Sequence, residues 1–228
     1  MGNEKVNVEK LNRDMEGIVS ASRRIQRRIP TAIPVGGTIV SYYTSNRVSF
    51  DVDHLLDRTI TDFDEILHLL TDLDGWKSTK NTNNIILGKL DGVEVGLRRM
   101  FRNTPIKTVR VQTKSGDWII PTLDEITGMK AILIAKRNAV RDFLDFVALA
   151  EVVNDDEKVV EILLGLSEGY SEDWTLPVLQ NLCDPNPEDL DEVNLAGYKN
   201  LDPKFHDWQI IREICQKYGK KMMVRKIK

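Results

Sequence analysis

The chain has 228 residues, of which 41% are apolar, and its 32 Lys and Arg against 35 Asp and Glu give a formal net charge of −3. This length and apolar fraction suffice for one large domain or two small ones with a buried core, and they exclude disorder as the main state. No stretch approaches the ~18 uncharged apolar residues of a membrane span, and the polar start is unlike a secretory signal. Cys183 and Cys215 lack the spacing of a zinc site, so we expect reduced thiols and a cytoplasmic protein. Because no apolar span is present, we expect no membrane partner.

Charge is unevenly distributed along the chain. Residues 151–207 hold 3 basic and 15 acidic side chains, whereas the rest holds 29 basic and 20 acidic, a net charge of +9. The last 21 residues carry seven Lys or Arg and one acid, Glu213. Such a basic region is typical of proteins that bind a polyanion such as RNA, and a solvated helix end with a frayed tail explains it equally well. We interpret the acidic stretch as solvated helix surface.

The predicted elements change in character near Pro121. Apolar periodicity and turn residues predict, in chain order, a helix over 6–28, extended chain between Pro30 and Pro34, a helix over 38–43, a strand over 47–53, a helix over 62–73, and strands over 84–88, 93–97, 109–112 and 118–120. The Asp91-Gly92 pair is typical of a hairpin turn between two of these strands. Beyond Pro121 the pattern is helical, over 123–139, 141–153, 158–166 and 208–217. We therefore predict an α+β fold with a mixed α/β region, 1–120, and a helical domain, 121–228.

The strand over 47–53 carries the first candidate site. Strict alternation places Asp51 and Asp53 on one face together with Ser49, and Val48, Phe50 and Val52 on the other. Two neighbouring carboxylates repel each other unless a cation lies between them, and Mg²⁺ prefers carboxylate oxygens while leaving positions for substrate phosphates. An exposed strand that happens to contain two aspartates is the alternative interpretation.

A glycine pair lies just upstream of this strand. Gly36 and Gly37 precede Thr38 where extended chain is expected to pass into a helix. Glycines let backbone N–H groups approach an anion closely, and a helix N-terminus favours phosphate. A glycine corner followed by an acidic strand supplies the two parts that binding of a nucleoside triphosphate requires.

A second block of charged residues lies in the helical half. If residues 123–149 form a continuous helix, Lys130, Arg137, Arg141 and Asp145 fall within about 80° of one another, with Asp142 towards the flank. Such a face can direct Lys130 to a phosphate while Asp145 holds the lysine. An exposed stripe with an Arg141–Asp145 pair is the alternative.

These two blocks carry a resemblance to a known family. The first, made of Gly36-Gly37-Thr38, Arg47, Ser49, Asp51 and Asp53, resembles the signature of the DNA polymerase β-like nucleotidyltransferase superfamily. A serine two residues before the first aspartate is similar to the AbiEii family, the toxins of type IV toxin–antitoxin systems. The second block, with Lys130 and Arg141-Asp142-Phe143-Leu144-Asp145, is similar to that family's later motifs. The resemblance covers residues 33–53 and 121–149, roughly a quarter of the chain.

The resemblance implies a nucleotidyltransferase-type mixed sheet flanked by helices, with the helical domain completing the active site. It implies a Mg²⁺-dependent enzyme that moves a nucleoside monophosphate from an NTP to an acceptor hydroxyl, at the 3′ end of RNA or tRNA, with an antitoxin as a further partner. Asp51 and Asp53 would hold the metal. The remaining implied site residues are Ser49, Lys130 and Asp145 as catalytic groups and Gly36, Gly37, Thr38, Arg47 and Asp142 as nucleotide-binding groups.

One catalytic group of the superfamily is left open. A third carboxylate usually lies on a later strand, and the matching segment here contains Glu94 and Gly96, so either Glu94 fills the role or Gly96 stands in its place. His54 is expected to be packed or solvent-facing. A catalytically silent binding module with the same fold, and transfer of a nucleotide to a protein hydroxyl, are the alternative functions.

Overall fold

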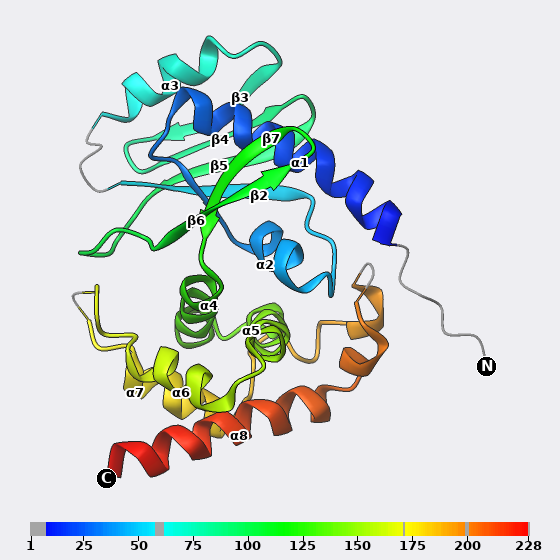
Figure 1. The fold of residues 1–228 in the computed structure, drawn as a ribbon, viewed down its shortest axis with the longest axis vertical. Helices are drawn as coiled ribbons and strands as arrows, with labels where there is room; N and C mark the ends of the chain where they lie inside the picture. Colours follow the sequence, from blue (N-terminus) through cyan, green and yellow to red (C-terminus); the bar gives the residue numbers. More distant parts are fainter. Residues whose placement is uncertain (1–7, 58–61, 171, 199–200, 228) are drawn as a thin grey trace. The chain divides into compact units, whose positions relative to one another are not determined.

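The computed structural model describes residues 8–57, 62–170, 172–198 and 201–227, with side chains from Met15 to Lys226 within these ranges. The chain divides into two compact units, Met1–Thr122 and Leu123–Lys228, each with its own buried core (Figure 1). The fold is α+β, with a mixed β-sheet and helices in the first unit and helices in the second, so the predicted fold class is confirmed.

The first unit is built on a five-stranded sheet. Its elements are α1 (Val8–Arg28), β1 (Ile33–Val35), α2 (Gly37–Thr44), β2 (Asp51–Leu56), α3 (Phe63–Thr71), β3 (Trp76–Thr82), β4 (Ile85–Leu90), β5 (Val93–Arg99), β6 (Thr108–Thr113) and β7 (Gly116–Pro121). The strand order is β1-β2-β5-β4-β3, in which β2 and β5 are parallel and the other pairs antiparallel. A separate antiparallel pair is formed by β6 and β7. The acidic strand β2 is therefore an interior strand of the sheet, next to β5.

One face of this sheet packs against helices. Buried residues of β2, β4 and β5 form a single apolar cluster with buried residues of α1 and α3: Ile18, Ala21, Ile25, Val52, Leu56, Phe63, Ile66, Leu70, Ile86, Leu90, Val95 and Leu97. Because side chains alternate along a strand, the opposite face of β2 carries Asp51 and Asp53, and that of β5 carries Glu94, Gly96 and Arg98. The core on one face thus fixes which side chains the other face presents.

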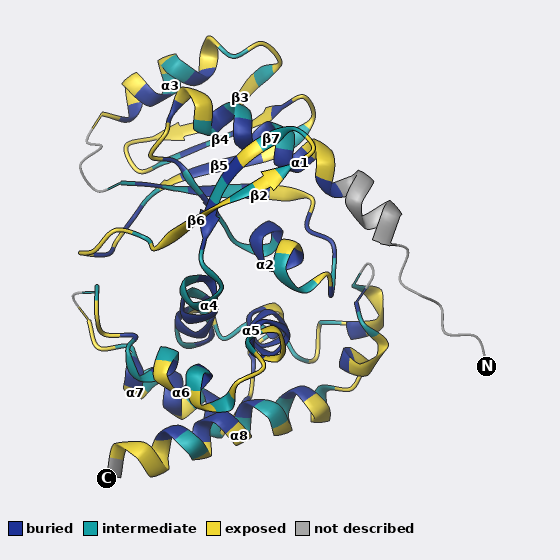
Figure 2. Cartoon of the chain, in the orientation of Figure 1, coloured by how far each residue is buried: buried dark blue, intermediate teal, exposed yellow. Residues whose placement is uncertain are grey.

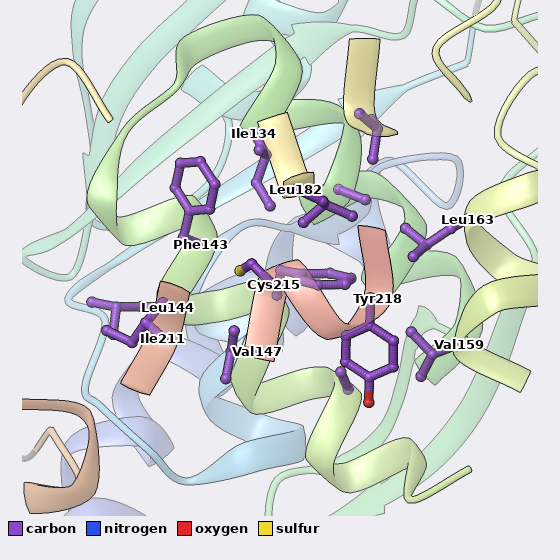
Figure 3. Close-up of a cluster of buried hydrophobic side chains, with 14 of the residues drawn as sticks. Ile134, Phe143, Leu144, Val147, Val159, Leu163, Leu182, Ile211, Cys215 and Tyr218 are labelled. Carbon is purple, nitrogen blue, oxygen red and sulfur yellow. The ribbon is translucent and has the colours of Figure 1, made fainter. Parts of the chain in front are cut away.

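The second unit consists of helices. They are α4 (Leu123–Arg137), α5 (Val140–Val153), α6 (Asp156–Leu164), α7 (Thr175–Cys183), the short 3₁₀ helices η1 (Leu195–Gly197) and η2 (Pro203–His206), and α8 (Trp208–Ile227). Figure 3 shows side chains of α4, α5, α6, α7 and α8 converging on one apolar cluster, with Phe143 and Tyr218 among the largest. Buried and exposed residues alternate along α8, as expected of a helix with one face against this core (Figure 2).

Two predicted elements are wrong in detail. The strand expected over 47–53 begins only at Asp51, and Phe50, expected on the core face, is 55% exposed. Strand β5 pairs with residues from Asp51 onwards and β1 with residues from Asp53 onwards, so residues 47–50 lie outside the pairing described for β2. The continuous helix expected over 123–149 is interrupted after Arg137, where Asn138 has a φ of 45°, outside the helical range.

The basic tail is paired inside the second unit. It is part of helix α8, and Lys217 Nζ lies 2.6 Å from a carboxylate oxygen of Asp156 on α6. Lys221 lies 3.1 Å from the same carboxylate, and Arg225 lies 3.3 Å from Glu157. The acids of residues 151–207 therefore neutralise part of the tail, which weakens the argument for a polyanion at this helix. In the part of the chain that the structure describes, no helix combines the length and apolar composition needed to cross a bilayer.

Candidate active site

The acid pair lies at the start of β2. Asp51 is exposed and Asp53 has 37% of its side chain exposed, on the face of the sheet opposite the helix-covered core. The carboxylate of Asp53 approaches the glycine corner, since a Cβ built on Gly36 would be 4.0 Å from its Oδ2 atom. The structure thus brings together the two sequence features that were expected to share one ligand.

The glycine corner leads directly into helix α2. Gly36 has a φ of 79° and a ψ of −154°, a conformation that side chains strongly disfavour, and it directly precedes the helix. A Cβ at Gly37 would lie 2.7 Å from Ser49 Oγ and 2.9 Å from Arg47 Nη2, so only glycine leaves room for these two side chains. The N–H groups in the first turn of α2 lack partners within the helix, as at any helix N-terminus, and such groups bind anions.

Two hydroxyl groups fix the first aspartate. Thr38 is fully buried and its Oγ1 donates a hydrogen bond to the backbone carbonyl of Asp51. Ser49 Oγ donates to Asp51 Oδ1 at 2.7 Å. The Thr38 hydroxyl therefore positions the acidic strand, and Ser49 orients the carboxylate itself.

The register of β2 and β5 bears on the third carboxylate. Asp51 lies opposite Glu94 and Asp53 opposite Gly96, on the same face. Glu94 has 67% of its side chain exposed and forms an ion pair with Lys89 at 3.0 Å. A Cβ at Gly96 would lie 2.2 Å from Asp53 Oδ1, so the Asp53 carboxylate occupies the space beside this glycine. The position directly beside Asp53 therefore carries no carboxylate, and the nearest acid on β5 is engaged with a lysine.

His54 is packed, as expected, on the core side of β2. It is fully buried, and a 2.9 Å hydrogen bond joins its Nε2 to Ser22 Oγ, which accepts another from Trp118 Nε1 at 3.0 Å. Burial lowers the pKa of His54 to about 3, and an interaction with the Gly96 backbone opposes this lowering only in part. The imidazole is neutral and ties β2 to α1 and β7 behind the acid pair.

The second predicted block forms a buried ionic cluster within the second unit. Lys130 Nζ lies 2.7 Å from Asp145 and 3.6 Å from Asp142, and both carboxylates are fully buried. Arg137 binds Asp142 through two nitrogens, at 2.6 and 3.0 Å. The break after Arg137 lets α5 fold back so that Lys130 on α4 meets Asp145 across a pair of helices. The lysine and the aspartate do meet, through helix packing rather than along one helical face.

The donor set of the first unit fits a magnesium ion. Within the described residues, Asp51 and Asp53 are not joined by a third His, Cys, Asp or Glu in a group able to hold a metal. Mg²⁺ is commonly held by one or two carboxylates, with substrate phosphates and water as its other ligands. The two aspartates beside an anion-binding corner match this requirement.

One charged residue at the site was missed by the sequence patterns. Arg98 Nε lies 3.6 Å from Asp53 Oδ1. Its proximity depends on the pairing of β2 with β5, strands separated by 36 residues, which no local pattern reveals.

Comparison with known proteins supports the fold. A scan against models of protein families finds no match. The chain is 31% identical over 121 residues to the mycolic acid-containing lipids exporter MmpL11 of Mycolicibacterium smegmatis, an alignment that spans 50% of this chain and 12% of that protein. Among solved structures, it is similar to MenT4, a nucleotidyltransferase toxin of Mycobacterium tuberculosis H37Rv, with a TM-score of 0.51, 13% identity and coverage of 94% of this chain and 89% of MenT4. A nucleotidyltransferase-like protein from Paracoccidioides brasiliensis matches 67% of this chain and 87% of its own with a TM-score of 0.47 and 15% identity. The similarity to MenT4 supports a nucleotidyltransferase-like fold for the chain. The chain spans only 11–12% of the length of the curated relatives that it matches.

Proposed function

We propose that the chain is a Mg²⁺-dependent nucleotidyltransferase that moves a nucleoside monophosphate from an NTP to an acceptor hydroxyl. The observation that carries the proposal is the approach of Asp53 to Gly36, with Asp51 on the same face of β2. This places two carboxylates next to the N-terminus of a helix, so one triphosphate can contact both a carboxylate-bound cation and backbone N–H donors.

Each residue of the site has a role in this proposal. Asp51 and Asp53 hold the magnesium ion, which when bound supplies positive charge to offset the triphosphate. The backbone of Gly37 and Thr38 binds the terminal phosphates, and Ser49 keeps the Asp51 carboxylate in place. The acceptor hydroxyl loses its proton to water, its oxygen forms a bond to the α-phosphorus while the bond to the β-phosphate oxygen breaks, and pyrophosphate leaves. Roles for Lys130, Asp142 and Asp145 in this reaction stay predictions.

The nature of the acceptor rests on the motif resemblance. Similarity to the AbiEii toxins favours the 3′ end of an RNA, tRNA in particular, and a cognate antitoxin as a partner. The similarity in fold to MenT4, named as a nucleotidyltransferase toxin, supports the toxin role in this proposal. The proposed cytoplasmic location follows from the expectation that Cys183 and Cys215 are reduced thiols.

A labelling experiment tests the activity. The chain is incubated with Mg²⁺, total RNA and each of the four α-labelled NTPs, and label in RNA and in protein is measured separately. The wild type is expected to label RNA, and Asp51→Asn to lose on the order of 100-fold or more of the rate, since the charge stabilisation from the cation is weakened. Asp191→Asn, the same change at an exposed turn residue, is the matched control and should keep full activity. Full activity of Asp51→Asn, with its circular dichroism unchanged, would refute the assignment.

A second candidate function is a catalytically silent binding module. The observation that favours it is Gly96, which leaves the position beside Asp53 without a carboxylate. In that case calorimetry detects nucleotide binding in the presence of Mg²⁺, but no NTP labels RNA or protein. Label on protein alone would favour a protein hydroxyl as the acceptor.

A further inference from the structure

Arg98 shares the face of the sheet that carries the acid pair. It lies on β5 two residues beyond Gly96, and in the parallel register it is opposite Leu55, one alternation beyond Asp53. Its Nε atom is 3.6 Å from Asp53 Oδ1, and 45% of the arginine side chain is exposed. The guanidinium group therefore lies beside the carboxylate that is proposed to hold a cation.

The carboxylate of Asp53 has a different neighbour for each oxygen. Oδ1 lies over Gly96 and towards Arg98, whereas Oδ2 lies towards Gly36 of the glycine corner. Any side chain at position 96 would displace Oδ1, because a Cβ there would be 2.2 Å away. The glycine thus lets Asp53 extend across to β5 and meet the arginine.

This ion pair is easily exchanged. Both partners are more than a third exposed, and ion pairs of this kind contribute little to stability. A divalent cation bound to Asp53 would compete with the guanidinium for the charge of this carboxylate and would repel it. An arginine released beside an anion-binding corner has a natural partner, because its five N–H donors match the oxygens of a phosphate.

We propose that Arg98 is a phosphate-binding residue of the nucleotide site: it pairs with Asp53 in the free protein and contacts the NTP triphosphate once a divalent cation occupies Asp53. This inference rests on the proposed function, since it requires that the acid pair binds metal and nucleotide together. Arg98 offsets one carboxylate charge in the free protein and part of the triphosphate charge in the bound state.

Binding measurements test this role without relying on catalysis. Mn²⁺, used in place of Mg²⁺, is titrated by electron paramagnetic resonance into the wild type, Arg98→Gln, Arg98→Lys and Asp53→Asn. Each of the four α,β-methylene NTPs is then titrated by calorimetry in saturating Mn²⁺, and a single-stranded RNA oligonucleotide is titrated separately. Arg110→Gln is the matched control, because Arg110 forms a similar exposed pair with Asp117 on the β6–β7 hairpin.

The two parts of the proposal predict opposite effects. Arg98→Gln is expected to bind Mn²⁺ alone about 3-fold more tightly, because the competing cation is gone, and to bind the NTP analogue about 10-fold or more weakly. Arg98→Lys should recover part of the NTP affinity, and Arg110→Gln should match the wild type in both titrations.

The outcomes separate the inference from the function on which it rests. If the wild type and Asp53→Asn bind Mn²⁺ equally weakly, the proposed metal site is wrong. If the wild type binds Mn²⁺ and the NTP analogue, and Arg98→Gln equals Arg110→Gln in both titrations, the proposed role of Arg98 is overturned while the function stands. If Arg98→Gln weakens binding of the RNA oligonucleotide but leaves NTP binding unchanged, the arginine serves acceptor phosphates, and its assignment to the triphosphate is overturned.

Discussion

Replacing Lys130 with methionine tests whether the buried cluster of the second unit holds that unit together. The lysine is 3% exposed and pairs with Asp145 at 2.7 Å, whereas Asp142 is also bound by Arg137. Lys130→Met therefore removes the buried cation nearest to Asp145 but leaves Asp142 with Arg137. A fully buried carboxylate that loses its cation strongly destabilises the folded state.

The expected loss is large compared with that of a surface pair. Removing one partner of a buried ion pair costs about 3–5 kcal/mol, a substantial fraction of the ~5–15 kcal/mol that stabilises a typical domain. Lys158→Met breaks the exposed pair between Lys158 and Asp124, and it should cost much less than Lys130→Met, because exposed ion pairs contribute little to stability. The double variant Lys130→Met/Asp145→Leu removes both charges and should recover much of the loss, since an apolar pair of similar volume replaces the ion pair.

Urea denaturation gives the free energy of unfolding of each variant, and hydrogen exchange with mass spectrometry locates the effect. Amides of α4 and α5 should lose protection in Lys130→Met, whereas those of β2 and β5 should keep it, because the two units have separate cores. A Lys130→Met protein within 1 kcal/mol of Lys158→Met, with α4 and α5 still protected, would refute the argument. In that case any loss of labelling activity would have to come from chemistry rather than from unfolding.

Three further changes probe the first unit and the α6–α8 contact. Gly37→Ala places a methyl group against Ser49 and should destabilise the protein by about 1–3 kcal/mol in urea denaturation, whereas Gly17→Ala, on the open surface of α1, should be neutral or slightly stabilising; equal effects would contradict the packing argument. The pKa of His54 in the folded protein is about 3, so the unfolded state takes up the proton first as the pH falls. The free energy of unfolding should therefore decline by about 1.4 kcal/mol per pH unit between about pH 6 and 3, relative to a His54→Gln protein. Parallel curves of unfolding free energy against pH for the two proteins would show that the imidazole is not buried. Hydrogen bonds from Lys217, Lys221 and Tyr218 outweigh desolvation and lower the pKa of Asp156 to about 2. The ionised carboxylate should therefore contribute about 1 kcal/mol to the free energy of unfolding above pH 4, after allowance for solvent screening, and this contribution should vanish towards pH 2. The Asp156→Asn protein should lack it at every pH.

Local sequence signals predicted most of the regular structure. The Asp91-Gly92 hairpin forms with both residues at positive φ, as a two-residue turn between twisted strands requires. The strand β3 was missed because it is an edge strand whose residues are almost all exposed, so apolar alternation is absent. Helix α7 was missed as well, since Pro177 near its start reads as a helix breaker, although proline is tolerated in a first turn.

The candidate site was predictable only where it depends on neighbouring positions. Asp51 and Asp53 share a face because they are two residues apart on one strand, and sequence alone establishes that spacing. The contact between Lys130 and Asp145 was anticipated, but along a continuous helix that Asn138 interrupts. Contacts that depend on packing between elements follow from the fold and not from periodicity.

Departures from regular structure gather at the proposed site. Gly36 adopts a positive φ. The strand-like alternation of the sequence begins at residue 47, but strand β2 begins only at Asp51. Gly96 is a glycine within a strand of larger side chains. Each departure serves one arrangement: the first turns the chain into α2, the second lets Ser49 cross over the corner and hydrogen-bond Asp51, and the third leaves space for the Asp53 carboxylate. Natural sequences tolerate such conflicts with local preference mainly where function requires them. Three independent conflicts around one pair of acids are more than a stable sheet needs, and they are accounted for if this corner binds a cation and a phosphate together.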